Sequence, residues 1–327
     1  MFRILSIDGG GIRGLIPATV LAALEDRTGR PVATLFDLIA GTSTGGLLAC
    51  GLTKPGTAGG PAYAARDLAA LYQHEGPRIF RQSLLRRVVA LGSLLDAKYP
   101  AKNIEPVLRH TFGETRLAEA LTDVIVPSYE LEGRIPWFFR SRRARTDPRY
   151  DFRMWQVARA TSAAPTYFPP ARLEALGPDP DTDRGFYALV DGGVYANNPA
   201  MCAYVEALSR EPRPPEILMV SVGTGQTTTP IRHRDARRWG RAAWAPWILD
   251  VVFDGVSDTI DYQLRHLLQP ARTGPVRHYR LQADVAPGED ELDDASAASL
   301  ARLKRVGEEI VRRNEAAITT LARELVA

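Results

Sequence analysis

The chain has 327 residues, of which 45% are hydrophobic and 24% are charged, and its formal net charge is +3. This composition is ordinary for a globular protein, and it excludes a disordered chain, a collagen and a coiled coil. The charge is too small to indicate a dedicated nucleic-acid binder, so we expect no nucleic-acid polymer as a partner.

The beginning of the chain alternates strand-like and helix-like segments. Arg3–Ile7 is a short apolar run before Asp-Gly, which predicts a buried strand. Leu15–Thr28 reads as a helix that ends before a glycine and a proline. A second strand is expected over Leu38–Ala40 and a buried helix over Thr44–Leu52. The same alternation continues further along the chain.

Three more strands are expected, over Asp123–Ser128, Leu189–Val190 and Ile217–Val222. From about residue 296 to 326, apolar residues recur every three or four positions and predict one long amphipathic helix. Its candidate N-caps are Asp293, Asp294 and Ser296. The alternation favours an α/β fold with a mostly parallel sheet covered by helices. We expect one domain over residues 1–327, with a candidate lid or insertion at about 230–272.

The sequence indicates a cytoplasmic protein without cofactors. Its longest nearly apolar run, Leu15 to Leu24, is far shorter than a membrane span of roughly 20 residues. No signal-peptide pattern is visible. Two cysteines cannot make a disulfide framework, and no zinc-type or calcium-type cluster is found, so we expect no metal requirement.

The segment Gly41-Thr42-Ser43-Thr44-Gly45 carries the strongest local signal. It has the Gly-x-Ser-x-Gly pattern, and it follows a predicted strand and precedes a predicted helix. Such a turn strains the backbone at the serine, and glycines let the turn close and a substrate approach. The pattern favours a nucleophilic serine; a glycine-rich phosphate loop and a plain packing turn are the alternatives.

The segment from Asp8 to Gly14 contains three consecutive glycines and Arg13. Its Gly-x-Gly-x-x-Gly spacing formally matches a dinucleotide-binding loop, but no acidic residue stands at the end of a second strand to bind the ribose. Backbone N–H groups exposed at a helix start suit an oxyanion hole. Arg13 adds a positive charge, unless it is a solvated arginine at the helix start.

The nucleophile needs a base, and Asp191 is the best candidate. It follows an apolar strand and precedes Gly192-Gly193, at the end of a strand where α/β sites form. An Asp-Gly hairpin turn is the alternative. The five histidines fit an α/β-hydrolase order less well, because only one clear strand precedes the strand that leads to Ser43. They are His74, His110, His233, His266 and His278.

Taken together, these motifs resemble the patatin-like phospholipases, and the similarity extends from about Ile4 to Thr224. Two further stretches, Ala158–Pro170 and Val194–Pro199, are also similar to the family. The resemblance implies a three-layer α/β/α fold with a mostly parallel central sheet. It implies a Ser43–Asp191 dyad without histidine. It also implies an oxyanion hole with Arg13 nearby and a set of motif glycines. The oxyanion residues are Gly9, Gly10 and Gly11, and the motif glycines are Gly41, Gly45, Gly192 and Gly193.

The activity that the resemblance implies is lipid acyl hydrolysis of the phospholipase A type, through an acyl-enzyme. Tyr167 and Phe168 are candidates for the pocket wall. An acyltransferase on the same fold and a nucleotide-binding module without hydrolysis are the alternatives. The resemblance also allows a bacterial defence effector that degrades membranes under the control of a nucleotide activator.

Residues 232–247 hold five arginines and three tryptophans. This composition suits docking on an anionic membrane surface, which would make the protein peripheral at the membrane. It equally suits stacking on a nucleotide. The remaining alternative is a segment whose tryptophans pack on the core and whose arginines are solvated.

Overall fold

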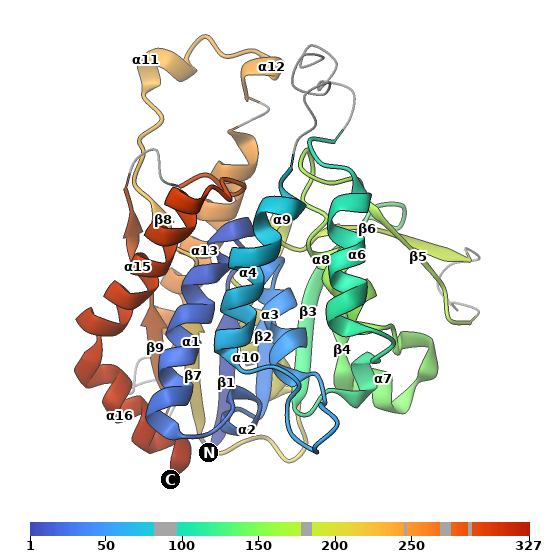
Figure 1. Cartoon of the computed structure of the whole chain (residues 1–327), viewed down its shortest axis with the longest axis vertical. Helices are drawn as coiled ribbons and strands as arrows, with labels where there is room; N and C mark the ends of the chain where they lie inside the picture. Colours follow the sequence, from blue (N-terminus) through green and yellow to red (C-terminus); the bar gives the residue numbers. More distant parts are fainter. Residues whose placement is uncertain (82–96, 178–184, 245–246, 269–275, 287–289) are drawn as a thin grey trace.

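The computed structural model describes residues 1–327 except 82–96, 178–184, 245–246, 269–275 and 287–289 (Figure 1). In the described part, eight strands form one sheet in the order β5-β6-β3-β2-β1-β7-β9, with β4 also paired to β3. The strands β1, β2, β3, β7 and β9 run parallel to one another. The strands are β1 (Phe2–Ile7), β2 (Leu38–Gly41), β3 (Asp123–Glu130), β4 (Ile135–Arg140), β5 (Ala171–Glu174), β6 (Phe186–Asp191), β7 (Ile217–Val222) and β9 (Val276–Leu281), with β8 (Gln226–Thr227) and β10 (Asp284–Val285) forming a separate pair.

The sheet is buried on both faces, which explains why its central strands are apolar at nearly every position. Along β1, Leu5 and Ile7 face one hydrophobic core, and Ile4 faces the other. Along β7, Leu218 alternates with Met219 in the same way. Helices cover both faces, so the fold has three layers. This arrangement confirms the expected fold class and the strands expected around residues 3, 38, 123, 189 and 217.

The larger layer of helices packs on the face of Leu5, and Figure 1 displays α1 and α4 in front of the sheet. The smaller layer packs on the face of Ile4. The larger layer holds α1 (Leu15–Thr28), α2 (Val32–Leu35), α3 (Thr44–Thr53), α4 (Ala65–Ile79), α6 (Ala101–Phe112), α8 (Met154–Thr161), α15 (Ala297–Arg313) and α16 (Glu315–Val326). The smaller layer holds α9 (Gly193–Ala196), α10 (Ala200–Leu208) and α13 (Ile248–Leu267). Shorter elements are α7 (Ser141–Thr146), η1 (Gly11–Gly14), η2 (Leu117–Glu119) and η3 (Pro148–Tyr150).

The C-terminal helix differs from the expectation of one continuous element. Ser296 caps it as expected, since its hydroxyl accepts a hydrogen bond from the N–H of Ser299 at 3.2 Å. At Asn314, however, the helix divides into α15 and α16. The amide of Asn314 donates to the carbonyl of Ile310 at 2.8 Å, which is the local competition with backbone bonding that makes asparagine a helix-ending residue.

Strand β3 brings two distant strand ends together. Strand β4 pairs along one edge of β3, at both Ile125 and Ser128. On the opposite edge, Ile125 pairs with β2 and Ser128 pairs with β6, so β2 and β6 lie end to end along that edge. Because β2 is parallel to β3 and β6 is antiparallel, their carboxyl ends point toward each other. One of these ends leads into Ser43 and the other is Asp191.

The segment expected as a lid contains α11 (His233–Ala236), α12 (Arg241–Trp244) and α13. Figure 1 shows α11 and α12 at the end of the molecule opposite both termini. Residues 245–246 and 269–272 of this segment lie outside the described residues. Among the helices that the structure describes, none is long and apolar enough to cross a bilayer.

Candidate active site

Ser43 stands at a sharp turn between β2 and α3. Its backbone has φ 55°, a left-handed conformation that non-glycine residues rarely adopt and that is typical of functional sites. The flanking glycines are required sterically. A Cβ atom on Gly41 would lie 2.0 Å from the carbonyl oxygen of Gly45, and one on Gly45 would lie 2.2 Å from that of Ile7. The turn therefore closes only with glycine at both positions.

A buried threonine holds this turn in place. The N–H of Ser43 donates to Oγ1 of Thr161 at 2.9 Å, and that hydroxyl donates to the carbonyl of Pro127 in β3 at 2.7 Å. Sequence reasoning assigned no role to Thr161. It lies in the stretch Ala158–Pro170 that carries the family resemblance, but a threonine at a helix end gives no signal of its own.

Asp191 is fully buried, and it lies beside Ser43. Its Oδ1 accepts a hydrogen bond from the N–H of Gly193 at 2.7 Å, whereas its Oδ2 has no hydrogen-bond partner among the described residues. Burial raises the pKa of Asp191 to about 7, and the nearby Ser43 hydroxyl and Gly193 N–H oppose that rise. The effect of the Ser43 hydroxyl on this pKa shows that the two side chains lie close together.

Gly192 and Gly193 make room for this carboxylate. A Cβ atom on Gly192 would lie 2.5 Å from the carbonyl oxygen of Pro127, so only glycine lets the chain leave β6 against β3. A Cβ atom on Gly193 would lie 3.1 Å from Oδ1 of Asp191 and 2.9 Å from the ring of Phe253. A side chain at either position would displace Asp191 or its surroundings.

The N-terminal glycines line the other side of Ser43. A Cβ atom on Gly9 would lie 3.3 Å from Cβ of Ser43. The N–H of Gly9 is already engaged, since it donates to the carbonyl of Asn197 at 2.9 Å. The N–H groups of Gly10 and Gly11, in contrast, have no partner within the described structure. Gly11 has φ +57° and lines the cavity that contains Ser43. Two of the three glycines expected in the oxyanion hole thus keep a free donor.

Arg13 does not line the cavity that holds Ser43. It is only 5% exposed, which excludes the solvated arginine considered from the sequence. Its Nη1 contacts Oγ1 of Thr227 at 3.4 Å, and its side chain lines a second cavity. The buried guanidinium of Arg13 thus lines a neighbouring, acidic cavity, while its N–H donates to the carbonyl of Gly10 at 3.1 Å; a role of Arg13 near the oxyanion hole stays a prediction.

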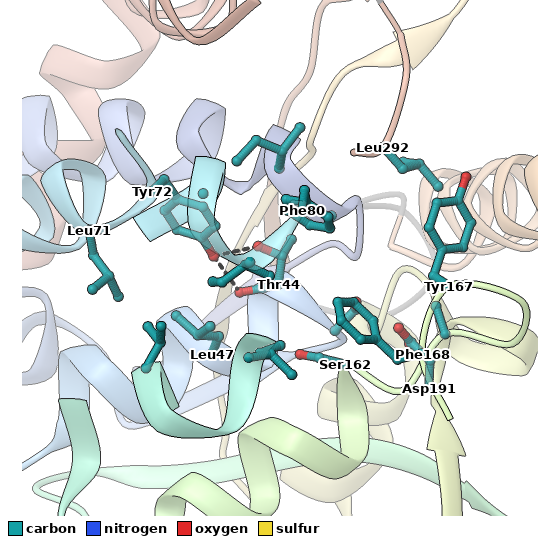
Figure 2. Close-up of a pocket in the computed structure, with 18 of the residues that line it drawn as sticks. Thr44, Leu47, Leu71, Tyr72, Phe80, Ser162, Tyr167, Phe168, Asp191 and Leu292 are labelled. Atoms are coloured by element: carbon teal, nitrogen blue, oxygen red, sulfur yellow. Dashed lines mark hydrogen bonds between the residues drawn. The ribbon is translucent and has the colours of Figure 1, made fainter. Parts of the chain in front are cut away.

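An apolar cavity runs from Ser43 and Asp191 into the larger helix layer. In Figure 2, Asp191, Tyr167 and Phe168 gather at one end and Leu71 lies at the other, so Tyr167 and Phe168 form part of the wall as expected. In the described structure, none of the five histidines lines this cavity. The apolar lining residues are Ile12, Leu47, Leu71, Ile79, Phe80, Ile104, Val107, Ala164, Phe168, Phe253 and Leu292.

Helix α13 closes the cavity from the other layer. Phe253 of α13 packs with Leu249 and Leu292 in a small hydrophobic cluster. The side-chain amide of Asn197 donates to Oγ of Ser257 at 3.0 Å and to the carbonyl of Phe253 at 3.4 Å. Since the carbonyl of Asn197 also accepts the N–H of Gly9, this residue connects α13 to the glycine loop. This link depends entirely on tertiary contacts, so no sequence pattern indicates it.

The three tryptophans of residues 232–247 pack on one another. The ring of Trp239 stacks on that of Trp247, with the ring centroids 5.5 Å apart. The ring of Trp244 contacts that of Trp239 edge-on, with the centroids 5.3 Å apart. Trp247 is exposed, and none of the three belongs to the hydrophobic cores of the described structure. The alternative of tryptophans packed on the core is therefore wrong. We call Trp239, Trp244 and Trp247 the tryptophan cluster.

The comparison with known proteins identifies the family of the chain. The model of the patatin-like phospholipase family matches residues 5–204. Patatin-like protein 4 of Arabidopsis thaliana is 34% identical over 345 residues, which cover 96% of this chain and 84% of the relative. Patatin-like protein 2 of Oryza sativa subsp. indica is 34% identical and Patatin-T5 of Solanum tuberosum is 33% identical, with the same coverage of 96% and 84%. This chain is thus a lipid ester hydrolase that belongs to the patatin-like phospholipase family.

Proposed function

We propose that the protein is a phospholipase A that cleaves the acyl esters of membrane phospholipids, with Ser43 as nucleophile and Asp191 as base. The observation that carries the proposal is the buried, unpartnered Oδ2 atom of Asp191 beside the strained Ser43, at one end of an apolar cavity. A carboxylate whose pKa is raised to about 7 is well matched to accepting a proton at neutral pH.

In the proposed reaction, Asp191 takes the hydroxyl proton while Oγ of Ser43 bonds to the ester carbonyl carbon. The tetrahedral intermediate then expels the lysophospholipid oxygen, which receives the proton from Asp191. A water molecule, deprotonated by Asp191, attacks the acyl-enzyme. The fatty acid leaves, and the proton returns to Ser43.

The N–H groups of Gly10 and Gly11 are the proposed donors to the oxyanion, because they have no other partner within the described residues. Gly9 contributes space rather than a donor, since its N–H is bound to Asn197 and its missing Cβ leaves room beside Ser43. The first turn of α3 points its N-terminal end at the same place and favours the developing negative charge.

The tryptophan cluster and its neighbouring arginines are the proposed contact with an anionic membrane. Arg232, Arg237 and Arg238 are exposed and make no ion pair within the described structure. Indole rings suit the interface between head groups and acyl chains, and arginines suit anionic lipid. We expect Trp239→Ala/Trp244→Ala/Trp247→Ala to reduce co-sedimentation with anionic liposomes. Arg237→Gln/Arg238→Gln should weaken binding to anionic but not to neutral liposomes; unchanged binding of both variants would reject the docking surface.

The function is tested by incubating a defined phospholipid with wild type, Ser43→Ala and Asp191→Asn. Wild type should release fatty acid and lysophospholipid, both variants should be inactive, and a fluorophosphonate should label Ser43 only in proteins that retain its hydroxyl. An acyl product on an added alcohol or thiol, in place of free fatty acid, would favour the acyltransferase. An unlabelled and inactive wild type would favour the nucleotide-binding module.

A second candidate role for the tryptophan cluster is binding of a nucleotide activator, as in a membrane-degrading defence effector. The stacking of Trp239 on Trp247 favours it, because such a surface also accepts a base. Cyclic nucleotides added to the phospholipase assay should then raise the activity of wild type but not of Trp239→Ala. No activation at millimolar concentration would reject this role.

A further inference from the structure

A second cavity adjoins the apolar cavity and has a different chemistry. It has a volume of about 390 Å³, and Tyr167, Phe253 and Leu292 line both cavities. A lipid whose acyl chain lies in the first cavity would therefore place its other end near the second. We call it the charged cavity. The charged residues that line it are Arg13, Lys98, Asp250, Asp254, Asp290, Glu291 and Asp293.

Some of these charges are satisfied by neighbours. Asp293 binds Nζ of Lys98 at 2.5 Å and the hydroxyl of Tyr99 at 2.6 Å. Asp290 accepts a hydrogen bond from Oγ1 of Thr229 at 3.3 Å. These contacts hold that side of the cavity in place and leave the other charges available.

Asp250 and Asp254 have no such neighbours. They lie one turn apart on α13 and so share one face of the helix. Neither makes a hydrogen bond or an ion pair with any described residue. Burial raises the pKa of both carboxyl groups, and the positive charge of Arg13 offsets only part of that rise.

Arg13 faces these carboxylates without reaching them. It is 5% exposed, its Nε has no partner in the described structure, and its closest polar contact is the long one to Thr227. Asp254 and Asp250 act on its pKa through space, yet no carboxylate of the described residues lies within ion-pair distance. A buried guanidinium without a counter-ion is costly, so a ligand that supplies an anionic oxygen would relieve that cost.

We propose that the charged cavity binds the zwitterionic head group of a phospholipid, with its ammonium group at Asp250 and Asp254 and its phosphate at Arg13. This inference rests on the proposed function. A zwitterion fits because Arg13 shares the cavity with Asp250 and Asp254 and forms no ion pair with either of them. An anionic head group fits poorly, because five carboxylates outnumber two cations. A bound divalent cation is not favoured, since no group of three acidic side chains in the described structure is arranged to hold one.

The test compares phosphatidylethanolamine with phosphatidylglycerol of identical acyl chains in neutral detergent micelles, where docking on anionic membranes plays no part. Wild type should prefer the zwitterionic lipid, and Asp250→Asn/Asp254→Asn should lose about tenfold of that preference in kcat/KM, equivalent to about 1.4 kcal/mol. Asp258→Asn is the matched control, since Asp258 lies one turn further along α13, contacts Gln226 and does not line the cavity. It should keep the wild-type preference.

Direct binding provides a second readout that does not depend on turnover. Ser43→Ala should bind glycerophosphoethanolamine more tightly than glycerophosphate. Adding Asp254→Asn to Ser43→Ala should remove this difference in affinity. Asp254→Asn alone replaces Asp250→Asn/Asp254→Asn in the assays if that double variant does not fold. Equal binding of the two probes, or an unchanged lipid preference in the double variant, would overturn the inference. Failure of wild type to cleave even p-nitrophenyl butyrate would instead overturn the proposed function.

Discussion

Removing the charge of Asp191 should abolish activity and stabilise the fold in a pH-dependent way. Burial lifts the pKa of this carboxyl from 3.8 to about 7, so the folded protein holds the proton more tightly than the unfolded chain does. The free energy of unfolding therefore falls as the pH rises from 3.8 toward 7, because the unfolded chain releases the proton first. The full cost above that range is about 4 kcal/mol, at 1.36 kcal/mol per pKa unit.

Asp191→Asn keeps the oxygen that accepts from Gly193 and removes this titration. Its free energy of unfolding relative to wild type should grow by about 3 kcal/mol between pH 5 and pH 8. Urea unfolding followed by tryptophan fluorescence measures the difference at each pH. In thermal melts the same change corresponds to roughly 2 °C per kcal/mol, or about 6 °C.

Ser43→Ala is the matched control, because it is also inactive but keeps the buried carboxyl. Its stability should fall from pH 5 to pH 8 as that of wild type does. If the difference between Asp191→Asn and wild type is the same at both pH values, the carboxyl does not titrate from a buried position, and the account of Asp191 as a proton acceptor near neutral pH is refuted.

Three further predictions concern the reaction itself. On a soluble ester, kcat/KM should fall about tenfold per pH unit below pH 7, because protonated Asp191 cannot accept the serine proton; a flat profile from pH 5 to pH 8 contradicts this. Gly10→Ala should lower kcat by about 10² to 10³, because its Cβ would lie 2.3 Å from Oγ1 of Thr224 and would shift the N–H groups of the glycine loop. Gly60→Ala is the control, because Gly60 has open space around it, and its kcat should equal that of wild type. Leu71→Trp should reduce cleavage of palmitoyl relative to butyryl esters by about tenfold or more, since Leu71 lies at the end of the cavity away from Asp191. Leu121→Trp, at an exposed position, is the control. An unchanged ratio in Leu71→Trp would mean that the acyl chain takes another path.

The strands and the serine turn could be predicted because their requirements are local. A strand covered on both faces must be largely apolar, as Leu218–Val222 is. A turn in which a Cβ atom on Gly41 would lie 2.0 Å from the carbonyl oxygen of Gly45 must have glycine at that position. The break at Asn314 was missed because the apolar period runs through it, and only the side-chain bond to Ile310 ends the helix.

The details of the site depended on contacts that no sequence pattern encodes. Glycine spacing predicts a loop rich in N–H donors, but it does not reveal that Asn197 occupies the donor of Gly9. Likewise, the motif predicts a basic residue near the oxyanion hole, but it does not reveal that the side chain of Arg13 also lines the charged cavity. Thr161 and α13 act through tertiary contacts alone.

Leu292 connects the C-terminal part of the chain to the glycine loop. Its carbonyl accepts the N–H of Ile12 at 2.9 Å and lies against Gly11, where a Cβ atom would approach it to 2.1 Å. The stretch recognised by the family model ends at residue 204, well before this tether. A fragment that ends at residue 204 would keep Ser43 and Asp191 but would lack the carbonyl of Leu292 that accepts from the glycine loop at Ile12. We therefore expect the glycine loop to depend on residues beyond the stretch that the family shares.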